Sequence, residues 1–575
     1  MQPRTLLQSL LFLALSLCAL APALPQLNSA IPTPVHGSRT VPLFNTWTIL
    51  WNSLQLHNGF PNYWHAPIFF PADHTFAFSE PQPATLLLAP LKPHASNPAL
   101  AYNAWLILSL TLNGVFAARI LRWLDIPIIF NSAASAAVVL HPLVHHQLDS
   151  AQLAPLWPSI WTTTAILQLS HLASSTPPCR RRVVFKGLES GLALCATAAC
   201  ALHHALFLAL LLLLTCPLAI PFRHLRNWLP GAIAASVALL PLLPAALLIH
   251  NALDAPHYIR EQALINQLSV QPADFIRSPP GAILQLPQLI GKSFFPINPG
   301  WLRLLACTTA ALTAAASLFP RTASQSLSSK QAYALRFLAA LTLAAALLAL
   351  GSRLQLGPLN LWSALAHYIP GFAQVRSPFR FAYFYQTYLL LLAAPGLSLL
   401  HHKLTQSNLF KLNLRSQFIT ALLAAIALTC ETLPHKLQLV GVPNPAQIPP
   451  WITAVRQHLP NGHGLLILPL PPDASAAAYE DTNRRMIHAT VNNVPLVNGY
   501  SGFFPPAHYE LQQQLRNPPT PQLTQKLLNQ NISAILSTSE ITTRQLLNAS
   551  PNSLAIRWQH PPSQTTLFQI QPATN

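Results

Sequence analysis

Carboxylates are scarce in this chain, and two of them lie close together in a polar stretch that is rich in aromatic residues. Only 14 of the 575 residues are Asp or Glu. Asp73 and Glu80 both fall in the stretch 25–98, after the first apolar segment. Carboxylates are common general acids and bases, and an acid among aromatic residues and prolines is a candidate for a perturbed pKa. Both residues are therefore candidate catalytic groups. The alternatives are a turn residue for Asp73 and a structural or binding role for Glu80.

A second candidate site is the pair of arginines in the stretch 371–381. Arg376 and Arg380 lie where a polar stretch leads into the long apolar segment 378–400. Guanidinium groups bind phosphate oxygens with bidentate geometry. The pair is therefore a candidate phosphate-binding site at a membrane interface. The alternative is that both side chains extend to ordinary lipid headgroups.

Three histidines, His141, His145 and His146, precede Asp149 and raise the question of a metal site. His145 and His146 are adjacent, so on a helix they point about 100° apart. We therefore favour polar residues that line a substrate cleft, with Asp149 among them. No metal or other cofactor is predicted, although a divalent cation is compatible with the sequence.

The composition places these residues in a membrane protein. The chain is 51% hydrophobic and 8% charged, whereas soluble domains average about 25% charged residues. The net charge is +18, but the basic residues form short clusters between apolar segments. This distribution argues against a nucleic-acid partner. The seven cysteines include no CxxC pair, which argues against a disulfide framework or a zinc site.

Eleven apolar segments approach the length of about 20 residues that a membrane helix needs. They are 5–24, 99–121, 126–145, 150–173, 187–200, 202–221, 228–250, 301–319, 332–351, 378–400 and 416–432. With a cytoplasmic N-terminus, the basic clusters other than Arg376 and Arg380 fall on cytoplasmic connections. This pattern requires two short helices within 187–222, with a turn at His203–His204. The alternative for the first segment is a cleaved signal peptide with Leu6–Ala21 as its apolar region.

One acid lies inside a predicted membrane segment. Ionisable groups in such segments are costly and often functional. Glu189, however, lies near the cytoplasmic end, where Lys186 or Arg182 is available as a partner. We therefore predict a structural role for it.

Aromatic residues in the first polar stretch are typical of a membrane interface. The pattern of Trp47, Trp51, Tyr63 and Trp64 fits an aromatic belt. Thr46–Leu56 fits an amphipathic helix lying in the interface. Trp47 and His65 are also candidates for lining a substrate cleft.

The composition changes after Glu431, where the proline-rich linker Pro443–Pro450 follows the last apolar segment. Periodicity beyond the linker predicts alternating helices and strands. The predicted helices are Trp451–Leu459, Ala507–Leu515 and Pro521–Asn529, and the predicted strands are Leu465–Leu470, Ser533–Ser537, Leu554–Trp558 and Thr566–Ile570. We thus predict an α-helical polytopic domain over 1–432, with a large outer loop at 25–98. A small extracytoplasmic α/β domain is predicted over 433–575.

Several motifs resemble those of a bacterial family of multi-spanning membrane proteins in the GT-C glycosyltransferase superfamily. The matching stretches are Asn45-Thr-Trp47, Ala66-Pro-Ile-Phe-Phe-Pro71, Ser79-Glu80, Asn97–Asn103, Asp149–Pro158, Arg376-Ser-Pro-Phe-Arg380-Phe and Leu496-Val-Asn-Gly-Tyr-Ser-Gly-Phe-Phe-Pro-Pro506. The resemblance implies a polyprenyl-phosphate sugar as the donor, as in the dolichyl-phosphate-mannose mannosyltransferases. It also implies a base in the first outer loop and transfer with inversion.

The resemblance assigns roles to individual residues. Glu80 is the first candidate for the base and Asp73 the second. Arg376 and Arg380 would bind the donor phosphate. The residues expected to line the substrate cleft are Asn45, Trp47, His65, Asp149, Asn498 and Tyr500. The sequence departs from the family at Val41, because relatives have an acid just before the proline that is Pro42 here.

The sequence therefore predicts a hexosyl- or pentosyltransferase of the bacterial inner membrane. It would transfer a sugar from a lipid-linked donor to a glycan, lipid or protein acceptor on the extracytoplasmic side. The first alternative is an inactive GT-C-fold protein that binds lipid or acts as a scaffold. A transporter is less favoured, because repeated halves and mid-membrane ionisable residues, the usual signs of one, are not evident in the sequence.

Overall fold

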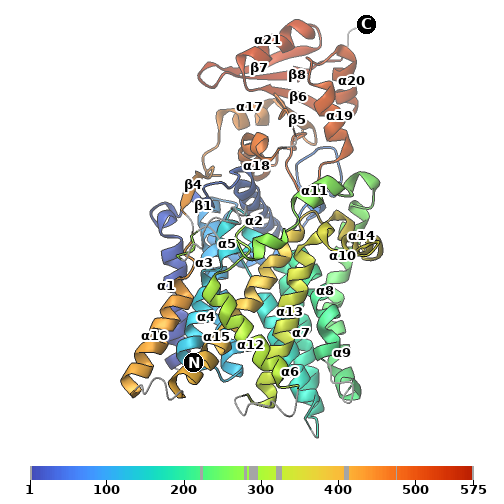
Figure 1. Ribbon diagram of the computed structural model, residues 1–575. Coiled ribbons are helices and arrows are strands. Elements are labelled where there is room, and N and C mark those ends of the chain that lie inside the picture. Colours follow the sequence, from blue (N-terminus) through green and yellow to red (C-terminus); the bar gives the residue numbers. More distant parts are fainter. Residues whose placement is uncertain are drawn as a thin grey trace. The chain divides into compact units, whose positions relative to one another are not determined.

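The chain folds into two compact units, each assembled from three separate segments (Figure 1). The computed structural model describes residues 3–175, 177–219, 225–277, 281–283, 295–318, 327–406, 413–434, 436–473 and 475–572. The bundle unit comprises Met1–Leu24, Leu106–His250 and Ile259–Gln438. The sheet unit comprises Pro25–Trp105, Asn251–Tyr258 and Leu439–Asn575. The loop predicted at 25–98 thus belongs to the same compact unit as the C-terminal residues.

Helices occupy most of every apolar segment of the bundle unit. They are α1 (Pro3–Ala19), α3 (Pro98–Trp123, beginning in the sheet unit), α4 (Ile128–Val139), α5 (Pro142–His146), α6 (Trp157–Ala173), α7 (Arg180–Cys200), α8 (Leu202–Ala219), α9 (Leu225–Leu239), α10 (Leu243–Ala252), α11 (Gln262–Gln267), α12 (Trp301–Ala316), α13 (Ser329–Ala349), α14 (Leu361–Tyr368), α15 (Phe381–Gln406) and α16 (Leu414–Cys430). Among the described residues, six helical segments are long and apolar enough to cross a membrane. The total of eleven membrane-spanning helices stays a prediction.

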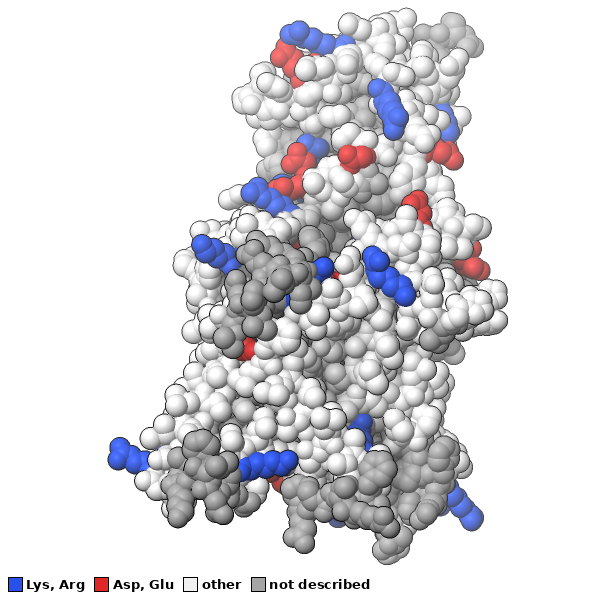
Figure 2. All heavy atoms as spheres, viewed as in Figure 1, with Lys and Arg blue, Asp and Glu red and all other residues white. Residues whose placement is uncertain are grey.

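The surface of the bundle helices fits a membrane environment. Figure 2 shows almost no charged side chains over most of their visible length. Close packing between the helices depends on small residues, which let two backbones approach. A Cβ on Gly187 in α7 would lie 2.1 Å from the carbonyl oxygen of Gly231 in α9. Likewise, a Cβ on Gly396 in α15 would lie 1.7 Å from the carbonyl oxygen of Ala306 in α12.

The stretch 187–222 contains two helices, as the charge pattern requires. α7 ends at Cys200, and Ala201 has an extended backbone with φ −156° and ψ 114°. α8 then begins at Leu202, so the break at Ala201 falls two residues before His203, where the predicted turn begins. Residues 220–224, which include Arg223, lie outside the described part of the chain.

Basic residues of several predicted cytoplasmic connections meet at one end of the bundle. Lys330 donates to Asp125 at 2.6 Å and to the Trp123 carbonyl at 2.7 Å. Arg122 donates to the Thr5 hydroxyl at 2.8 Å. Arg321 and Lys411, which also belong to predicted cytoplasmic connections, lie outside the described residues. This grouping is consistent with the predicted topology, and the orientation in the membrane stays a prediction.

The sheet unit is built around a four-stranded sheet with the order β5-β6-β8-β7. Its strands are β5 (Gly464–Leu468), β6 (Ile532–Ser537), β7 (Leu554–His560) and β8 (Thr565–Ile570). β5 pairs with β6 in parallel, and the remaining pairs are antiparallel. The helices of this unit are α2 (Thr40–Asn58), α17 (Pro450–His458), α18 (Glu480–Val491), α19 (Pro506–Gln514), α20 (Pro521–Asn529) and α21 (Glu540–Ala549). Two further strand pairs are present in the described residues. β1 (Ala30–Pro34) pairs with β4 (Leu437–Gly441), and β2 (Gln355–Leu356) pairs with β3 (Leu359–Asn360) in the bundle unit.

The first loop extends this sheet, which explains why it belongs to the sheet unit. Beside β5 lies the stretch 495–497, with Leu465 N–H donating to the Pro495 carbonyl and Val497 N–H to the Leu465 carbonyl. The stretch 67–70 follows, since Phe70 N–H donates to the Leu496 carbonyl at 2.8 Å and Leu496 N–H to the Pro67 carbonyl at 3.1 Å. The motifs Ala66–Pro71 and Leu496–Pro506 are therefore hydrogen-bonded neighbours.

α2 is a buried helix, which corrects the prediction of an amphipathic helix in the membrane interface. Its residues are buried almost all round, and α18 packs against it. Trp47 is 1% exposed and donates its indole N–H to the Thr490 hydroxyl at 2.8 Å. Trp51 donates to the Tyr63 carbonyl at 3.0 Å. Both indoles find their partners inside the unit, so they are core residues and not members of an aromatic belt.

Candidate functional site

Glu80 lies on a loop whose following residues are held by α2. The Asn52 side chain is fully buried and donates to the Pro81 carbonyl at 2.8 Å and to the Gln82 carbonyl at 3.1 Å. Its oxygen accepts from the Tyr63 hydroxyl at 2.8 Å. Gln82 in turn donates to the Asn45 side-chain oxygen at 2.7 Å. Buried hydrogen-bond networks of this kind fix a local conformation.

The residues before Glu80 are held by the motif 496–506. Phe503 N–H donates to the Phe78 carbonyl at 2.9 Å. A Cβ on Gly502 would lie 3.0 Å from the same oxygen, so glycine eases this close approach. Glu80 is thus half-buried between two fixed points of the sheet unit.

Asp73 has a different environment. Its side chain is 82% exposed, and its Oδ1 lies 3.6 Å from Nδ1 of His65, which is 43% exposed. A solvated carboxylate in a turn is held less firmly than Glu80. The geometry therefore favours Glu80 as the candidate base, and His65 is brought beside Asp73, the second candidate.

The predicted cleft residues of the sheet unit have identifiable structural partners. Asn45 is 1% exposed and donates to the Val41 carbonyl at 3.0 Å. Tyr500 packs against the rings of Phe44 and Tyr479, with centroid distances of 5.4 and 5.3 Å. Contact of Asn45, Trp47 or Tyr500 with a substrate stays a prediction.

Asn498 joins the motif 496–506 to the central sheet. Its side-chain oxygen accepts from Ile467 N–H at 2.7 Å, and its amide donates to the Ile467 carbonyl at 2.8 Å. Asn498 is 4% exposed, so these groups have no ready access to water.

Replacing Asn498 by Leu is expected to destabilise the sheet unit by about 2–4 kcal/mol, because two buried backbone groups lose their partners. Hydrogen exchange of the amides of residues 464–468 in the full chain would measure this, with faster exchange expected in the variant. Asn517→Leu, at an exposed position of the same unit, serves as the control. Unchanged exchange in Asn498→Leu would contradict the bracing role.

In the bundle unit, Arg380 and Asp149 gather around one buried tyrosine. Tyr383 lies in the first turn of α15 and is fully buried. Arg380 and Asp149 both lie close enough to interact electrostatically with its phenol. Arg380 also lies close enough to interact electrostatically with the His204 imidazole. The structure thus brings these two predicted residues into one polar cluster, whereas Arg376 is exposed.

The histidines at 141–146 are engaged with the protein. His141 Nε2 lies 3.3 Å from the Tyr383 carbonyl and 3.4 Å from the Thr387 hydroxyl. His145 Nε2 lies 3.1 Å from the Val139 carbonyl. Within the described ranges, no three His, Cys, Asp or Glu residues are arranged to hold a metal ion.

Glu189 has the structural partners expected from its position. It pairs with Lys186, with Arg119 at 2.8 Å, and with the Trp161 indole N–H at 2.8 Å. The lysine partner was predicted, whereas Arg119 and Trp161 come from helices that the sequence could not place beside it.

The sheet unit also contains a pocket of about 200 Å³. Its lining includes Phe69 and Phe70 of the first loop and residues of α19, α20 and β6. Among them is His508, which is 5% exposed and lies 3.3 Å from the Tyr479 hydroxyl. Burial lowers the pKa of His508 to about 4, from an ordinary value near 6.5.

Because the folded protein holds His508 neutral, acidification should weaken the fold. The unfolded chain takes up a proton as the pH falls through 6.5, while the folded chain resists until about 4. The stability that depends on neutral His508 is therefore fully present above pH 6.5. The free energy of unfolding falls by up to about 3 kcal/mol as the pH is lowered toward 4. His508→Gln should reduce this loss, as measured by thermal unfolding of the full chain at several pH values. A pH dependence equal to that of the control His458→Gln, at an exposed site, would contradict the assignment.

The chain thus combines a bundle of apolar helices with a sheet unit, in which the loop that carries Glu80 is held on both sides. Comparison with solved structures gives the class of fold. The chain is a membrane protein with the GT-C glycosyltransferase fold. It is similar to the arabinofuranosyltransferase AftD from Mycobacteria, with a TM-score of 0.54 and 15% identity, over 99% of this chain and 40% of AftD. A mutant of AftD gives a TM-score of 0.56 at 15% identity, over 100% of this chain and 42% of the mutant chain. The chain thus spans about two fifths of the length of AftD.

More distant similarity extends to two other solved structures. The oligosaccharyltransferase AglB from Archaeoglobus fulgidus has a TM-score of 0.46 and 12% identity, over 99% of this chain and 74% of AglB. ArnT from Cupriavidus metallidurans, bound to undecaprenyl phosphate, has a TM-score of 0.44 and 12% identity, over 97% of each chain. No family model and no curated protein sequence matches this chain.

Proposed function

We propose that this protein is an inverting glycosyltransferase of the bacterial inner membrane. It takes a sugar from a polyprenyl-phosphate donor and transfers it to an acceptor hydroxyl on the extracytoplasmic side. The N-terminus would be cytoplasmic and the C-terminal region extracytoplasmic. The observation that carries the proposal is the half-buried Glu80 on a loop braced from both sides in a chain of GT-C fold.

In this mechanism the acceptor oxygen attacks the anomeric carbon of the donor sugar. Its proton passes to the Glu80 carboxylate as the new bond forms. The bond between the anomeric carbon and the phosphate oxygen breaks, and polyprenyl phosphate leaves with the electron pair. Attack opposite the leaving group inverts the anomeric configuration. A base must be held in place for this step, and the bracing of the Glu80 loop supplies that rigidity.

The leaving phosphate carries negative charge, which a guanidinium would stabilise. Arg380 suits this role better than Arg376, because it is half-buried, where electrostatic interactions are screened less. Arg380 and Asp149 both lie within electrostatic range of Tyr383.

The test is donor turnover by the purified full chain in lipid nanodiscs. Radiolabelled polyprenyl-phosphate arabinose and polyprenyl-phosphate hexoses would be supplied with envelope glycan extracts. Release of polyprenyl phosphate with label in a glycosidic product supports the proposal. Lipid binding without turnover would instead favour an inactive scaffold, as the loss of the acid at Val41 suggests.

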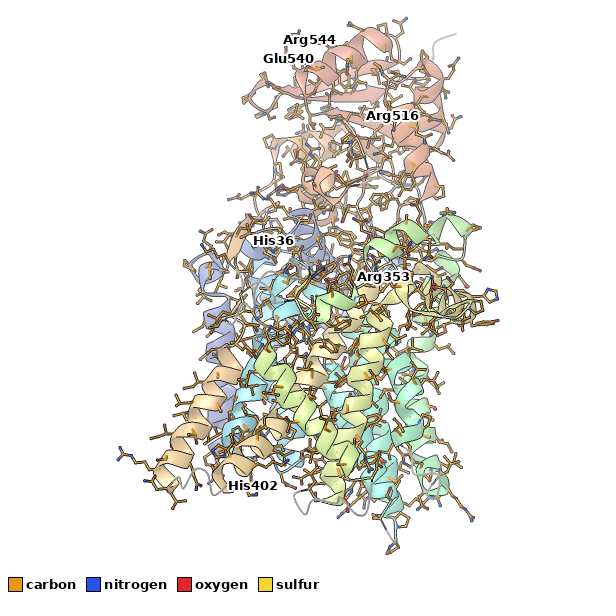
Figure 3. The ribbon with its side chains drawn as sticks, in the orientation of Figure 1. His36, Arg353, His402, Arg516, Glu540 and Arg544 are labelled. Carbon is orange, nitrogen blue, oxygen red and sulfur yellow. The ribbon has the colours of Figure 1, made fainter. Side chains whose placement is uncertain are left out.

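Arg380→Ala is expected to raise the KM for the donor about 10- to 100-fold, because a charge-assisted contact is worth about 1.5–3 kcal/mol. Arg376→Ala should have a smaller effect, since its exposed side chain interacts through water. Arg353→Ala is the control, because Arg353 is an exposed arginine of the same unit (Figure 3). Equal KM values for Arg380→Ala and Arg353→Ala would contradict the role of Arg380.

A further inference from the structure

The pocket in the sheet unit has a rigid aromatic wall. The Phe70 ring lies against Gly464, where an added Cβ would be 2.4 Å from the ring. The Phe69 ring lies against Gly499, where a Cβ would be 2.8 Å away. Phe69 also has a φ of 56°, a left-handed conformation that is costly for a bulky residue. Strain of this kind tends to be retained at functional sites.

The floor and rim of the pocket differ in polarity. Leu511 and Leu527 contribute apolar surface from α19 and α20. At the mouth, α19 presents Glu510 and Gln514, and α20 presents Lys526, with Gln530 at its end. Each pair is spaced i, i+4, which places both members on one face of the helix. The rim carries one acid, one base and two amides, so it has no net charge.

These features fit a neutral sugar ring. A sugar offers an apolar face of C–H groups to an aromatic wall, and hydroxyls that both donate and accept at its edge. Amides also both donate and accept. A phosphate would meet Glu510, and an apolar side chain would leave the rim groups unused. The volume of about 200 Å³ is below the roughly 300–1,000 Å³ of pockets for larger ligands, which suits a single ring.

We propose that this pocket binds one sugar residue of a neutral glycan acceptor. The inference rests on the proposed function, and it names the acceptor class. The pocket wall is connected to the candidate base through an aromatic contact. The centroids of the Phe69 and Phe78 rings lie 6.3 Å apart, and Phe78 is two residues before Glu80 in the sequence. A glycan bound in the pocket would therefore contact the same loop that carries Glu80.

Binding can be tested without turnover. The full chain in nanodiscs would be titrated with short fluorescent oligosaccharides of arabinofuranose, mannose, galactofuranose or glucose. At least one should bind the wild type and Glu80→Gln equally well. Gln514→Ala should weaken that binding about fivefold, the effect of one lost hydrogen bond. Gln513→Ala, the exposed neighbour outside the pocket, should leave it unchanged. Leu523→Trp, which fills the pocket, should abolish it, with thermal unfolding confirming that the variant is folded.

The outcomes separate this inference from the proposed function. Binding that depends on Gln514 without any sugar transfer would support the pocket and contradict the transferase. Transfer by the wild type that persists in folded Leu523→Trp, with an unchanged acceptor KM, would overturn the pocket assignment alone. Absence of binding by every oligosaccharide, or equal loss in Gln513→Ala and Gln514→Ala, would also overturn it.

Discussion

Changing Glu80 to Gln is expected to lower kcat for sugar transfer about 10²- to 10⁴-fold, the usual contribution of a general base. Gln keeps the size and shape of the side chain, but it cannot take the proton of the acceptor hydroxyl. The braces on both sides of the loop do not involve the carboxylate. Donor binding should therefore remain as in the wild type. The measurement is single-turnover transfer with radiolabelled donor, together with the donor Kd.

Asp73→Asn is the matched control, because it makes the same chemical change in the same loop. Its side chain is 82% exposed, so we expect transfer within about twofold of the wild type. If Asp73→Asn abolishes transfer while Glu80→Gln does not, the assignment of the base is wrong. If both variants transfer normally, neither residue is the base.

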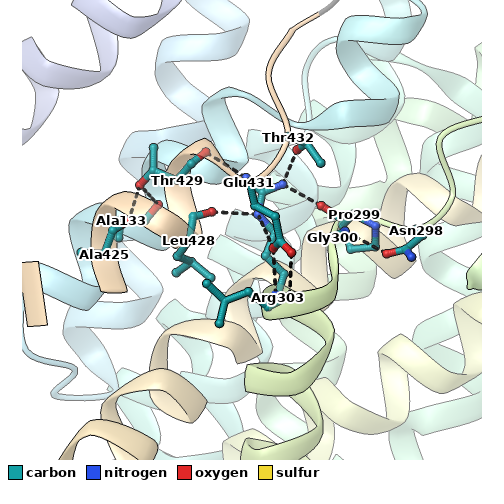
Figure 4. A network of polar contacts seen from close by, with 11 residues as sticks. Ala133, Asn298, Pro299, Gly300, Arg303, Ala425, Leu428, Thr429, Glu431 and Thr432 are labelled. Atoms are coloured by element: carbon teal, nitrogen blue, oxygen red, sulfur yellow. Dashed lines mark hydrogen bonds and ion pairs between the residues drawn. The ribbon is translucent and has the colours of Figure 1, made fainter. Parts of the chain in front are cut away.

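The second large effect is expected at a buried ion pair in the bundle unit. Arg303 is fully buried at the start of α12, and its Nε lies 3.9 Å from Oε2 of Glu431, just after α16 (Figure 4). Glu431 accepts the N–H groups of Leu302 and Arg303 at 2.6 and 3.0 Å. The guanidinium donates to the carbonyls of Leu428, Pro299 and Thr429 and to the Thr432 hydroxyl. Gly300 makes room, since a Cβ there would lie 2.3 Å from the Glu431 carboxyl carbon.

Arg303→Met should destabilise the protein by about 3–5 kcal/mol, because it leaves a carboxylate buried without its cation. Unfolding in mixed micelles with increasing dodecyl sulfate would measure the change. Arg544→Met is the control, since Arg544 pairs with Glu540 on the exposed face of α21 (Figure 3) and surface pairs contribute at most about 1 kcal/mol. Equal stability of the two variants would refute a role for the buried pair.

The helices of the bundle could be predicted from sequence because their signal is local. Long apolar segments such as α13 and α15 are recognisable from hydropathy alone. The separation of α7 from α8 followed from the basic clusters on either side. In the sheet unit, apolar runs predicted β5 and β6. The helices α18 and α21 were not predicted, although both are amphipathic in sequence.

The position of the first loop could not be predicted, because it depends on contacts far apart in sequence. Nothing in Ala66–Pro71 indicates that its partner is 495–498. The burial of α2 had the same cause, since the partner of Trp47 is Thr490, more than 400 residues later. Aromatic residues therefore gave the pattern of a membrane interface while they formed a protein core.

The candidate site was predicted in part. Residue types marked Glu80, Asp73, Arg380 and Asp149 as candidates one by one. Only the structure separates a braced Glu80 from an exposed Asp73, and only the structure groups Arg380 with Asp149. The pocket beside Phe69 was missed, because its lining comes from four separate segments. A repeated i, i+4 pairing of polar residues on α19 and α20 was its one signal in the sequence.

Turnover of a labelled polyprenyl-phosphate sugar, measured side by side for wild type and Glu80→Gln, decides whether Glu80 is the base of a sugar transfer. We expect a labelled glycosidic product and released polyprenyl phosphate from the wild type. We expect a loss of at least about 10²-fold in the variant, with equal donor binding in both. Equal turnover by the two proteins, or no turnover by the wild type with any donor it binds, would contradict this role of Glu80.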